Sequence, residues 1–213
     1  VANAYVTLRM LRRIGCSLPV ELFYADESEM SAEVVELLEG MGVVCYNIYH
    51  LPNVSSSLPL RGFQIKAFAV VFSSFEEVIW LDSDVVPLRN PLELFSSALY
   101  SAHGNVFWQD WSRDPHWISR DFLAAYGLRM EDGERELEAG QFAVSKRRAW
   151  RALQVVLYIN SHFMHFYRRM YGDKDSWRLA FKLARLPLGR VARAADAVGL
   201  LDPSGRFCGN TMM

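Results

Sequence analysis

The stretch EVIWLDSDVVPLRNP, residues 77–91, carries the most information about the fold. Its apolar run at residues 78–81 predicts a buried strand that ends at Asp82 and Asp84, followed by a turn rich in proline and asparagine. Alternate residues of a strand face the same way, so we expect both carboxylates to project together. Two carboxylates suit Mg²⁺ or Mn²⁺, the ions that accompany phosphate groups. The motif therefore indicates metal-assisted handling of a nucleotide diphosphate.

The composition is that of an ordinary globular protein. A chain of 213 residues with 51% hydrophobic content can bury a core as one domain. A net charge of -1, from 23 basic and 24 acidic residues, provides no basic surface for nucleic acid, so we expect no such partner. The cysteines Cys16, Cys45 and Cys208 are far apart in sequence and form no CxxC pair, so neither a disulfide framework nor a zinc site is indicated.

The ends of the chain suggest an excerpt from a longer polypeptide. The sequence opens on Val1 inside a helical pattern and stops at Met213 directly after FCGNTMM. No apolar stretch reaches the ~18 residues that a membrane-spanning helix needs. We therefore expect that any membrane anchor lies outside these residues, and that the domain is truncated at both ends.

Hydrophobic periodicity predicts alternating helices and strands. The expected helices cover residues 5–14, 29–41, 62–74, 95–100, 149–166 and 175–186, and the expected strands cover residues 19–24, 43–48, 78–81, 105–109 and 141–145. This rhythm predicts an α/β fold of the Rossmann-like kind, with a mostly parallel sheet flanked by helices. Ligands of such sheets lie beyond the carboxyl ends of the strands, where the sequence places Asp82 and Asp84.

The same motif admits a second enzyme class. An apolar strand that ends in DxDxV, residues 82–86, resembles the first motif of dehalogenase-type phosphatases, in which Asp82 would be the nucleophile and Asp84 the acid or base. That motif normally lies on the first strand of its domain, whereas about 80 residues precede it here. A catalytically dead carbohydrate-binding domain is a third alternative, and carboxylates at strand ends also cap helices or decorate turns.

Three ordered blocks resemble a known family. The stretch RGFQIKAFAVVFSSFEEVIWLDSDVVPLRNPLELF, residues 61–95, is similar to the donor-binding core of nucleotide-sugar glycosyltransferases with the GT-A fold, in particular the fungal-type α-mannosyltransferases of the Mnn1 kind. EAGQFAVSKRRAW, residues 138–150, and GDKDSWRLAF, residues 172–181, resemble that family's two downstream blocks. LPVELFY, residues 18–24, and VFWQDW, residues 106–111, also fit. Such ordered blocks are more specific than a DxD motif alone.

The resemblance implies a metal and donor site in the first block. Asp82 and Asp84 match the DxD motif, which holds a divalent ion, usually Mn²⁺, against the donor diphosphate, with Asp82 and Ser83 beside the donor. Lys66 matches a basic residue on the preceding helix that faces the donor, and Arg61 would assist it. The alternative for both cations is a solvated helix face.

The two downstream blocks supply the expected sugar site. Glu138, Gly140 and Gln141 match the block that lines the sugar, where a glycine lets the backbone approach a ligand closely. A plain β-turn would also explain residues 138–140. Asp173 and Lys174 match an acidic dipeptide near the anomeric carbon, so Asp173 is expected to stabilise an oxocarbenium-like transition state. A helix N-cap is the competing role for Asp173.

A polar and aromatic loop follows the strand at residues 105–109. Asp110 and Trp111 are predicted to bind the glycan acceptor, because an aromatic ring stacks on sugar faces while a carboxylate binds hydroxyls. The neighbouring Trp108 and Trp117 are more typical of core residues. Many enzymes of the GT-A fold complete the metal site with a histidine near the end of the domain, and no match for it occurs before Met213.

Together these features predict a single glycosyltransferase catalytic domain over residues 1–213. Residues 1–100 would form the nucleotide-sugar-binding half, and residues 101–213 the half that faces the acceptor and the sugar. The resemblance implies transfer of a hexose, most simply mannose from GDP-mannose, to a glycan hydroxyl with retention of configuration. It also implies a parent protein anchored in the membrane of the Golgi and facing its lumen.

Overall fold

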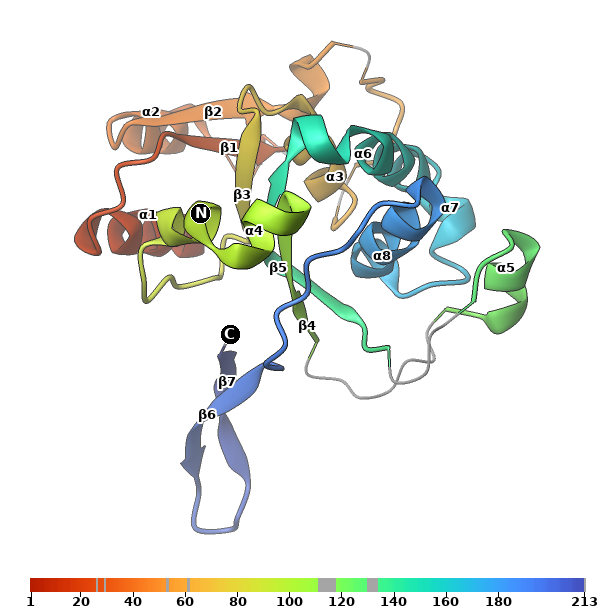
Figure 1. Ribbon diagram of the computed structural model, residues 1–213. Helices are drawn as coiled ribbons and strands as arrows, with labels where there is room; N and C mark the ends of the chain where they lie inside the picture. Colours follow the sequence, from red (N-terminus) through yellow and green to blue (C-terminus); the bar gives the residue numbers. More distant parts are fainter. Residues whose placement is uncertain are drawn as a thin grey trace.

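The computed structural model describes residues 1–25, 27–28, 30–52, 54–60, 62–110, 118–129 and 134–212 (Figure 1). The α-helices within them are α1 Ala2–Arg13, α2 Ala32–Glu39, α3 Ile65–Phe72, α4 Ala98–His103, α5 Arg120–Ala125, α6 Lys146–Ser161, α7 Phe163–Phe166 and α8 Gly172–Ala184. The strands are β1 Val20–Tyr24, β2 Val43–Asn47, β3 Glu77–Leu81, β4 Asn105–Gln109, β5 Leu137–Ser145, β6 Asp196–Leu201 and β7 Phe207–Met212. Short 3₁₀ helices cover Ile48–His50 and Pro91–Ser96.

The strands form three separate sheets. β1 pairs in parallel with β2, β5 lies between β3 and β4, and β6 forms a hairpin with β7. The pairing of β1 with β2 across α2 is the parallel β-α-β unit that the sequence predicts. The structure is therefore a mixed α/β fold with one small parallel sheet.

The prediction of a mostly parallel sheet is wrong for the central strands. Both β3 and β4 run antiparallel to β5, so β3 and β4 are parallel to each other but are not neighbours. Hydrophobic periodicity correctly indicates the strands and the helical crossover from β3 to β4. It also indicates a strand at residues 141–145, which is the second half of β5. It contains no information about the direction of β5 or about its place between β3 and β4.

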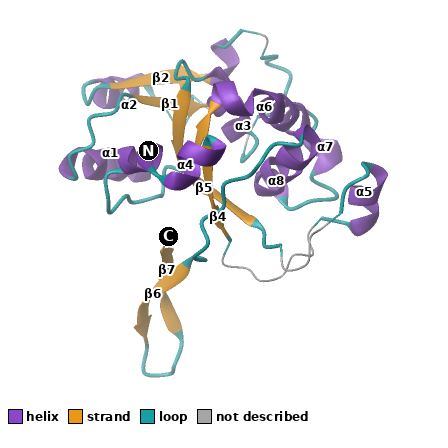
Figure 2. Cartoon of the chain, viewed as in Figure 1, coloured by secondary structure: helices purple, strands orange, loops and turns teal. Residues whose placement is uncertain are grey.

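The core lies on both faces of the central sheet (Figure 2). Because alternate strand residues face opposite sides, Phe142 joins the large cluster under α3, α6 and α8, whereas Ala143 joins a smaller cluster under α4. The ring of Phe142 lies 4.9 Å from that of Phe107 and 4.5 Å from that of Trp177, between centroids. These aromatic contacts fix α8 against β4 and β5.

Several helix boundaries differ from the predicted ones for local reasons. The expected helix at 149–166 is divided at His162 into α6 and α7, and the expected helix at 95–100 is a 3₁₀ segment followed by α4. α4 begins after Ser97, whose hydroxyl accepts a hydrogen bond from the Tyr100 amide at 3.2 Å. It ends at Gly104, which has a φ of 69° in the left-handed region that favours glycine.

The β6–β7 hairpin and α5 were not predicted. Figure 1 shows the hairpin extending away from the rest of the molecule, with β6 and β7 paired only to each other. Its apolar residues Val198, Leu200 and Leu201 are exposed. Among the described residues, neither face of the hairpin packs on a core. Its sequence therefore lacks the alternation of apolar and polar residues that predicts a strand.

Candidate functional site

The DxD motif forms a turn at the carboxyl end of β3, as the sequence predicts. The amide of Asp82 donates to the carbonyl of Gly140 at 2.7 Å, which extends the β3–β5 ladder by one step. On the other side, the buried Thr7 of α1 shares its hydroxyl proton between the carbonyls of Ser83 and Val85, at 2.9 and 2.8 Å. The turn is thus fixed between β5 and α1.

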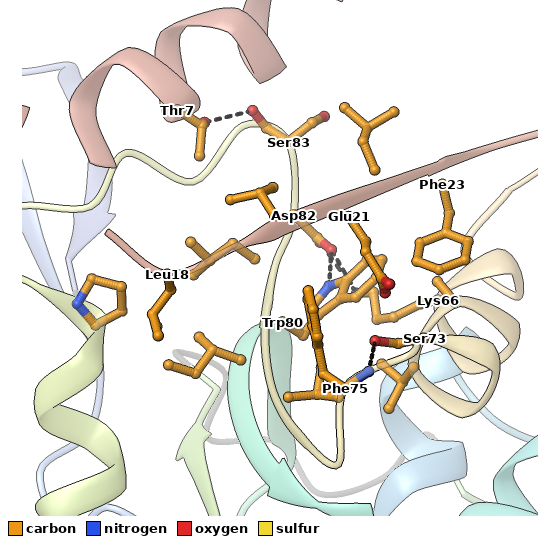
Figure 3. A pocket seen from close by; sticks show the side chains of 18 of the residues that line it. Thr7, Leu18, Glu21, Phe23, Lys66, Ser73, Phe75, Trp80, Asp82 and Ser83 are labelled. Carbon is orange, nitrogen blue, oxygen red and sulfur yellow. Dashed lines mark hydrogen bonds and ion pairs between the residues drawn. The ribbon is translucent and has the colours of Figure 1, made fainter. Parts of the chain in front are cut away.

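The two carboxylates of the motif have different surroundings. Asp82 is half-buried, and its Oδ1 accepts a hydrogen bond of 2.6 Å from the indole Nε1 of Trp80. Trp80 precedes Asp82 by two positions, so both side chains lie on one face of the strand (Figure 3). Asp84 is exposed and makes no hydrogen bond or ion pair with another described residue. Its oxygens are therefore open to a ligand.

Lys66 of α3 is the centre of the site. Its ammonium nitrogen lies 3.0 Å from Asp82 Oδ1, 3.1 Å from Asp173 Oδ2 and 2.6 Å from the carbonyl oxygen of Ala139. These partners come from the end of β3, from α8 and from β5. The Lys66 side chain is only 5% exposed, which excludes the alternative of a solvated helix face. An ammonium group has three N–H donors, and here three protein groups surround it.

A β-bulge in β5 exposes the backbone at this point. β4 pairs Phe107 with Phe142 and then Trp108 with Glu138, so residues 139–141 of β5 have no partner on β4. The carbonyl of Ala139, outside that ladder, is the one that accepts from Lys66. Bulges frequently lie next to active sites, where they redirect backbone and side chains. Residues 138–140 belong to β5, so the alternative of a plain β-turn is wrong.

The predicted sugar-lining residues lie on this bulge. A side-chain atom on Gly140 would lie 3.1 Å from Glu138 Oε1 and 3.7 Å from Asp82 Oδ2, so glycine allows the backbone to approach both carboxylates. Glu138 Oε1 accepts hydrogen bonds from the amides of Ala139 and Gly140, at 2.9 and 2.7 Å. Gln141 is half-buried opposite Leu81. The structure therefore brings Glu138, Gly140 and Gln141 close to the DxD turn.

The environment of Glu138 leads to a prediction about stability. Burial raises the pKa of the Glu138 carboxyl above its ordinary value, although the Gly140 amide opposes this. Between the ordinary pKa and the raised one, the native protein binds more protons than the unfolded chain. The contribution of Glu138 to the free energy of unfolding should therefore fall as pH rises through this window and then remain constant.

The substitution Glu138→Gln removes the titration and keeps a carbonyl that can accept from both amides. We expect the stability of the variant relative to the natural protein to increase with pH across that window. Urea unfolding of both proteins between pH 4 and pH 8 measures the difference. Parallel stability curves would show that the native pKa of Glu138 is ordinary.

Asp173 lies in the first turn of α8, buried beside Lys66. Burial raises its pKa, Lys66 opposes the increase, and the nearby Asp82 adds to it. Asp173 is not the N-cap residue, because Tyr171 occupies that position. The Tyr171 amide donates to Oδ2 of Asp175, inside the helix, at 2.7 Å. Helix α8 begins at Gly172, three positions earlier than predicted, and this places Asp173 inside the helix.

Lys174 and Asp110 form an ion pair, which joins α8 to the end of β4. Lys174 also lies 2.8 Å from Glu136 Oε2. Burial alone would lower the pKa of Lys174, but hydrogen bonds to Asp110 and Glu136 raise it above the ordinary value. The predicted donor-binding Lys174 and the predicted acceptor-binding Asp110 therefore contact each other, next to the first turn of α8.

Sequence reasoning missed the ion pairs that attach α8 to the segment before β5. Lys174 is joined to Glu136 in this way, whereas Arg178 pairs with Asp175 within α8 itself, at 2.9 Å and with both side chains 1% exposed. Lys182 and Arg190 each lie 2.8 Å from the fully buried carboxylate of Glu134. The spacing of Lys174, Arg178 and Lys182, four residues apart on one helix face, was a usable signal. These contacts hold the bulged strand and Asp173 in fixed relation.

A metal ion at the motif would have Asp82 and Asp84 as its protein ligands. Among the residues described, no group of three histidine, cysteine or acidic side chains could hold a metal ion. One or two carboxylates together with substrate phosphates are a common set for Mg²⁺. The pair thus fits an ion that binds together with a phosphate better than one held by protein groups alone.

Two predicted site residues lie outside the described part of the chain. They are the donor-binding Arg61 and the acceptor-binding Trp111. Trp108, by contrast, is half-buried at the end of β4, where it packs beside Ala143. Within the described residues, no helix is long and apolar enough to span a membrane.

Comparison with known proteins identifies the class of the protein. The chain shares its fold with the glycosyltransferase GlyE of Streptococcus pneumoniae TIGR4, with a TM-score of 0.50 and 14% identity over 90% of this chain and 42% of that one. A family model described as "Mannosyltransferase putative" matches residues 1–136 and 126–213. The chain therefore belongs to this mannosyltransferase family, and the resemblance inferred from its three sequence blocks is confirmed.

Curated relatives carry α-mannosyltransferase names. Alpha-1,2-mannosyltransferase MNN21 of Candida albicans is 28% identical over 96% of this chain and 39% of its own length. Alpha-1,2-mannosyltransferase MNN2 of Saccharomyces cerevisiae is 32% identical over 53% of this chain and 20% of its own length. A match to MNN23 of Candida albicans covers 98% of this chain and 43% of the relative. The chain thus spans about two fifths of the length of the relatives that it matches over nearly all of its own.

Proposed function

We propose that this chain is the catalytic domain of a mannosyltransferase, which moves mannose from GDP-mannose to a glycan hydroxyl with retention of configuration. The arrangement of side chains around Lys66 is the observation that supports this proposal most strongly. Asp82 and Asp173 are far apart in sequence, yet their carboxylates lie 3.0 and 3.1 Å from one ammonium nitrogen. The residue assigned to the donor diphosphate is therefore adjacent to the one assigned to the reacting sugar.

The ion proposed for this site is Mn²⁺ or Mg²⁺, with Asp82 and Asp84 as ligands. When bound, such an ion neutralises charge on the leaving nucleoside diphosphate. Thr7 and the β3–β5 ladder keep the motif in position, and Trp80 orients the Asp82 carboxylate. Asp84 would then supply the oxygens that are exposed, whereas Asp82 is partly neutralised by Lys66.

Lys66 has a positioning role in this proposal. The sequence assigned it to the donor, but its ammonium is surrounded by Asp82, Asp173 and the Ala139 carbonyl beneath the motif. In this position its positive charge offsets the repulsion between the two carboxylates beside the proposed donor site. Ser83 and Lys174 remain proposed donor contacts at the edge of the site.

The sugar would lie between the bulge of β5 and the start of α8. Glu138, Gly140 and Gln141 line one side, where glycine permits close approach of the ligand. Asp173 is buried on the other side, and its negative charge would stabilise an oxocarbenium-like transition state. Asp110, with Trp111, is the proposed acceptor contact. The proposed halves, residues 1–100 and 101–213, thus meet at Lys66.

Family membership leaves the phosphatase alternative without support. Its nucleophile would be Asp82, whose carboxylate is engaged by Lys66 and by the Trp80 indole. A domain that binds carbohydrate without catalysis remains an outcome that experiment must distinguish. The family resemblance implies a location in the Golgi, so we also propose that the parent protein acts in the Golgi lumen, anchored by a segment outside residues 1–213.

Calorimetric titration of GDP-mannose, GDP and UDP-sugars into the full-length parent protein, first with Mn²⁺ and then with EDTA, tests the proposal. We expect GDP-mannose and GDP to bind only with the metal, and UDP-sugars to bind weakly or not at all. Transfer of radiolabelled mannose to an oligomannose glycan measures the activity. Glycan binding by a folded protein that binds no nucleotide sugar would indicate the dead domain, and release of phosphate would indicate the phosphatase.

A further inference from the structure

A chain of buried hydrogen bonds joins the end of α6 to the first turn of α8. The two helices lie side by side (Figure 1), and Asn160 of α6 and Ser176 of α8 are both fully buried. The side-chain amide of Asn160 donates to Ser176 Oγ at 2.9 Å and to the Val156 carbonyl at 2.8 Å. Ser176 Oγ in turn donates to the carbonyl of Asp173. The chain therefore ends on the residue whose carboxylate lies beside Lys66.

Tyr167 stands at the other end of this chain. It directly follows α7, and its phenol donates to Asn160 Oδ1. Burial raises the pKa of the Tyr167 phenol, and the negative charge of Asp173 raises it further, so this hydroxyl keeps its proton and acts as the donor. The direction of the chain is thus fixed, from Tyr167 through Asn160 and Ser176 to Asp173.

The side chain of Asn160 uses all of its hydrogen-bonding groups. An amide has two N–H donors and one carbonyl oxygen, and its three contacts match this set. A buried amide that lacks such partners destabilises a fold, whereas a satisfied network holds its members in one arrangement. Apolar contacts such as those of Val156 and Trp177 already pack α6 and α8 into one core. The polar chain adds a fixed orientation of the first turn of α8.

We propose that Asn160 and Tyr167 are positioning residues for Asp173. Its carboxylate lies 3.1 Å from the ammonium of Lys66 in α3, and its carbonyl accepts from the chain that begins in α6 and α7. These two attachments, one on the side chain and one on the backbone, hold the carboxylate where the sugar would react. Asn160 is fully buried, so it acts only through its neighbours. The inference rests on the proposed function, because it assumes that Asp173 takes part in transfer.

Substitutions at the two ends of the chain, made in the full-length parent protein, test the inference. Tyr167→Phe removes only the first donor, and Ser176→Ala removes the link next to Asp173. We expect each to lower kcat for mannose transfer about 10-fold or more, because small displacements of a reacting group are costly. KM for the donor should change less than about 2-fold, because other contacts, from Thr7 and β5, hold the DxD turn.

Tyr100→Phe is the matched control. Tyr100 of α4 is also buried, and its phenol donates to Glu77 Oε1 at 3.0 Å, but it packs on the opposite face of the central sheet. Its kcat and KM should stay within about 2-fold of those of the natural protein. An unchanged kcat in Tyr167→Phe, or equal losses in Tyr167→Phe and Tyr100→Phe, would overturn the inference.

An equilibrium measurement separates this inference from the proposed function. Urea unfolding of Tyr167→Phe, Asp173→Asn and the double variant gives the coupling between the two sites. Loss of the phenol should weaken the contact of Asp173 with Lys66, so Asp173→Asn should change the unfolding equilibrium constant at least about 3-fold less in the Tyr167→Phe background. Additive effects would overturn the inference. Coupling in a protein that transfers no mannose would support the positioning of Asp173 and reject the proposed function.

Discussion

The substitution Asp84→Ala is expected to abolish metal-dependent binding of the nucleotide sugar while the domain remains folded. Asp84 is exposed and makes no hydrogen bond or ion pair with another described residue, so its removal leaves no buried polar partner and should change stability by less than about 1 kcal/mol. A metal ligand, by contrast, stabilises bound diphosphate by several kcal/mol, so we expect donor affinity with Mn²⁺ to fall more than about 100-fold. Calorimetry measures the affinity, and thermal unfolding measures the stability.

The matched control for this experiment is Glu93→Ala. Glu93 is also an exposed carboxylate shortly after β3, but it pairs with Arg89 rather than facing the DxD turn. Its replacement should leave both donor affinity and Mn²⁺ dependence unchanged. Mn²⁺-dependent transfer that survives in the Asp84→Ala protein would remove Asp84 from the metal site. Equal losses in both variants would point to the net charge of the surface instead.

The sequence predicted β3 and its DxD motif because both depend on the pattern of residues that are neighbours in the chain. Four consecutive apolar residues followed by two acids describe a strand that leaves the core at a defined point, and the structure ends β3 at Leu81. The resemblance to a family added what periodicity lacks, namely the order of blocks far apart in sequence. The structure brings residues 138–141 and Asp173 close to Asp82, and their roles at a donor or sugar stay predictions.

The hydrophobic periodicity of the sequence predicts neither the bulge in β5 nor the direction of that strand. Apolar alternation continues through Phe142 and Val144 regardless of whether the neighbouring strand is parallel or antiparallel. Residues 139–141 have no partner on β4, and the Ala139 carbonyl accepts from Lys66, which lies 73 positions earlier in the sequence. The register of β5 depends on contacts between residues far apart in sequence. The geometry of the proposed sugar site was therefore visible only in the folded chain.

The sequence also indicated that Lys66 was unusual, but it did not predict the protein groups that surround the ammonium group. A lysine within the apolar run of α3 suggested a ligand, because buried ammonium groups need a partner. The structure supplies protein partners, Asp82 and Asp173, in place of solvent. Pairing between residues this far apart in sequence cannot be derived from spacing. Whether a donor phosphate also reaches Lys66 stays a prediction.

Replacing Lys66 by methionine is expected to cause the largest loss of stability of any single substitution in the site. The change would leave the buried Asp173 without its counter-ion and close to Asp82, which is 30% exposed. Removal of one partner from a buried ion pair costs roughly 3–5 kcal/mol. For a chain of this size, each kcal/mol shifts the melting temperature by roughly 2–4 °C, so calorimetric melting should reveal the change clearly.

The double variant Lys66→Met with Asp173→Asn separates a positioning role from simple packing. Neutralising Asp173 removes the unpaired buried charge, so the double variant should be more stable than Lys66→Met alone. We expect it to bind the donor better than Lys66→Met does, but to transfer mannose more slowly than the natural protein. Arg147→Met is the control, because its ion pair with Glu76 is exposed and contributes at most about 1 kcal/mol. If the two lysine variants were equally unstable, the unpaired charge of Asp173 would not be the cause of the instability, and the proposed positioning role of Lys66 would be contradicted.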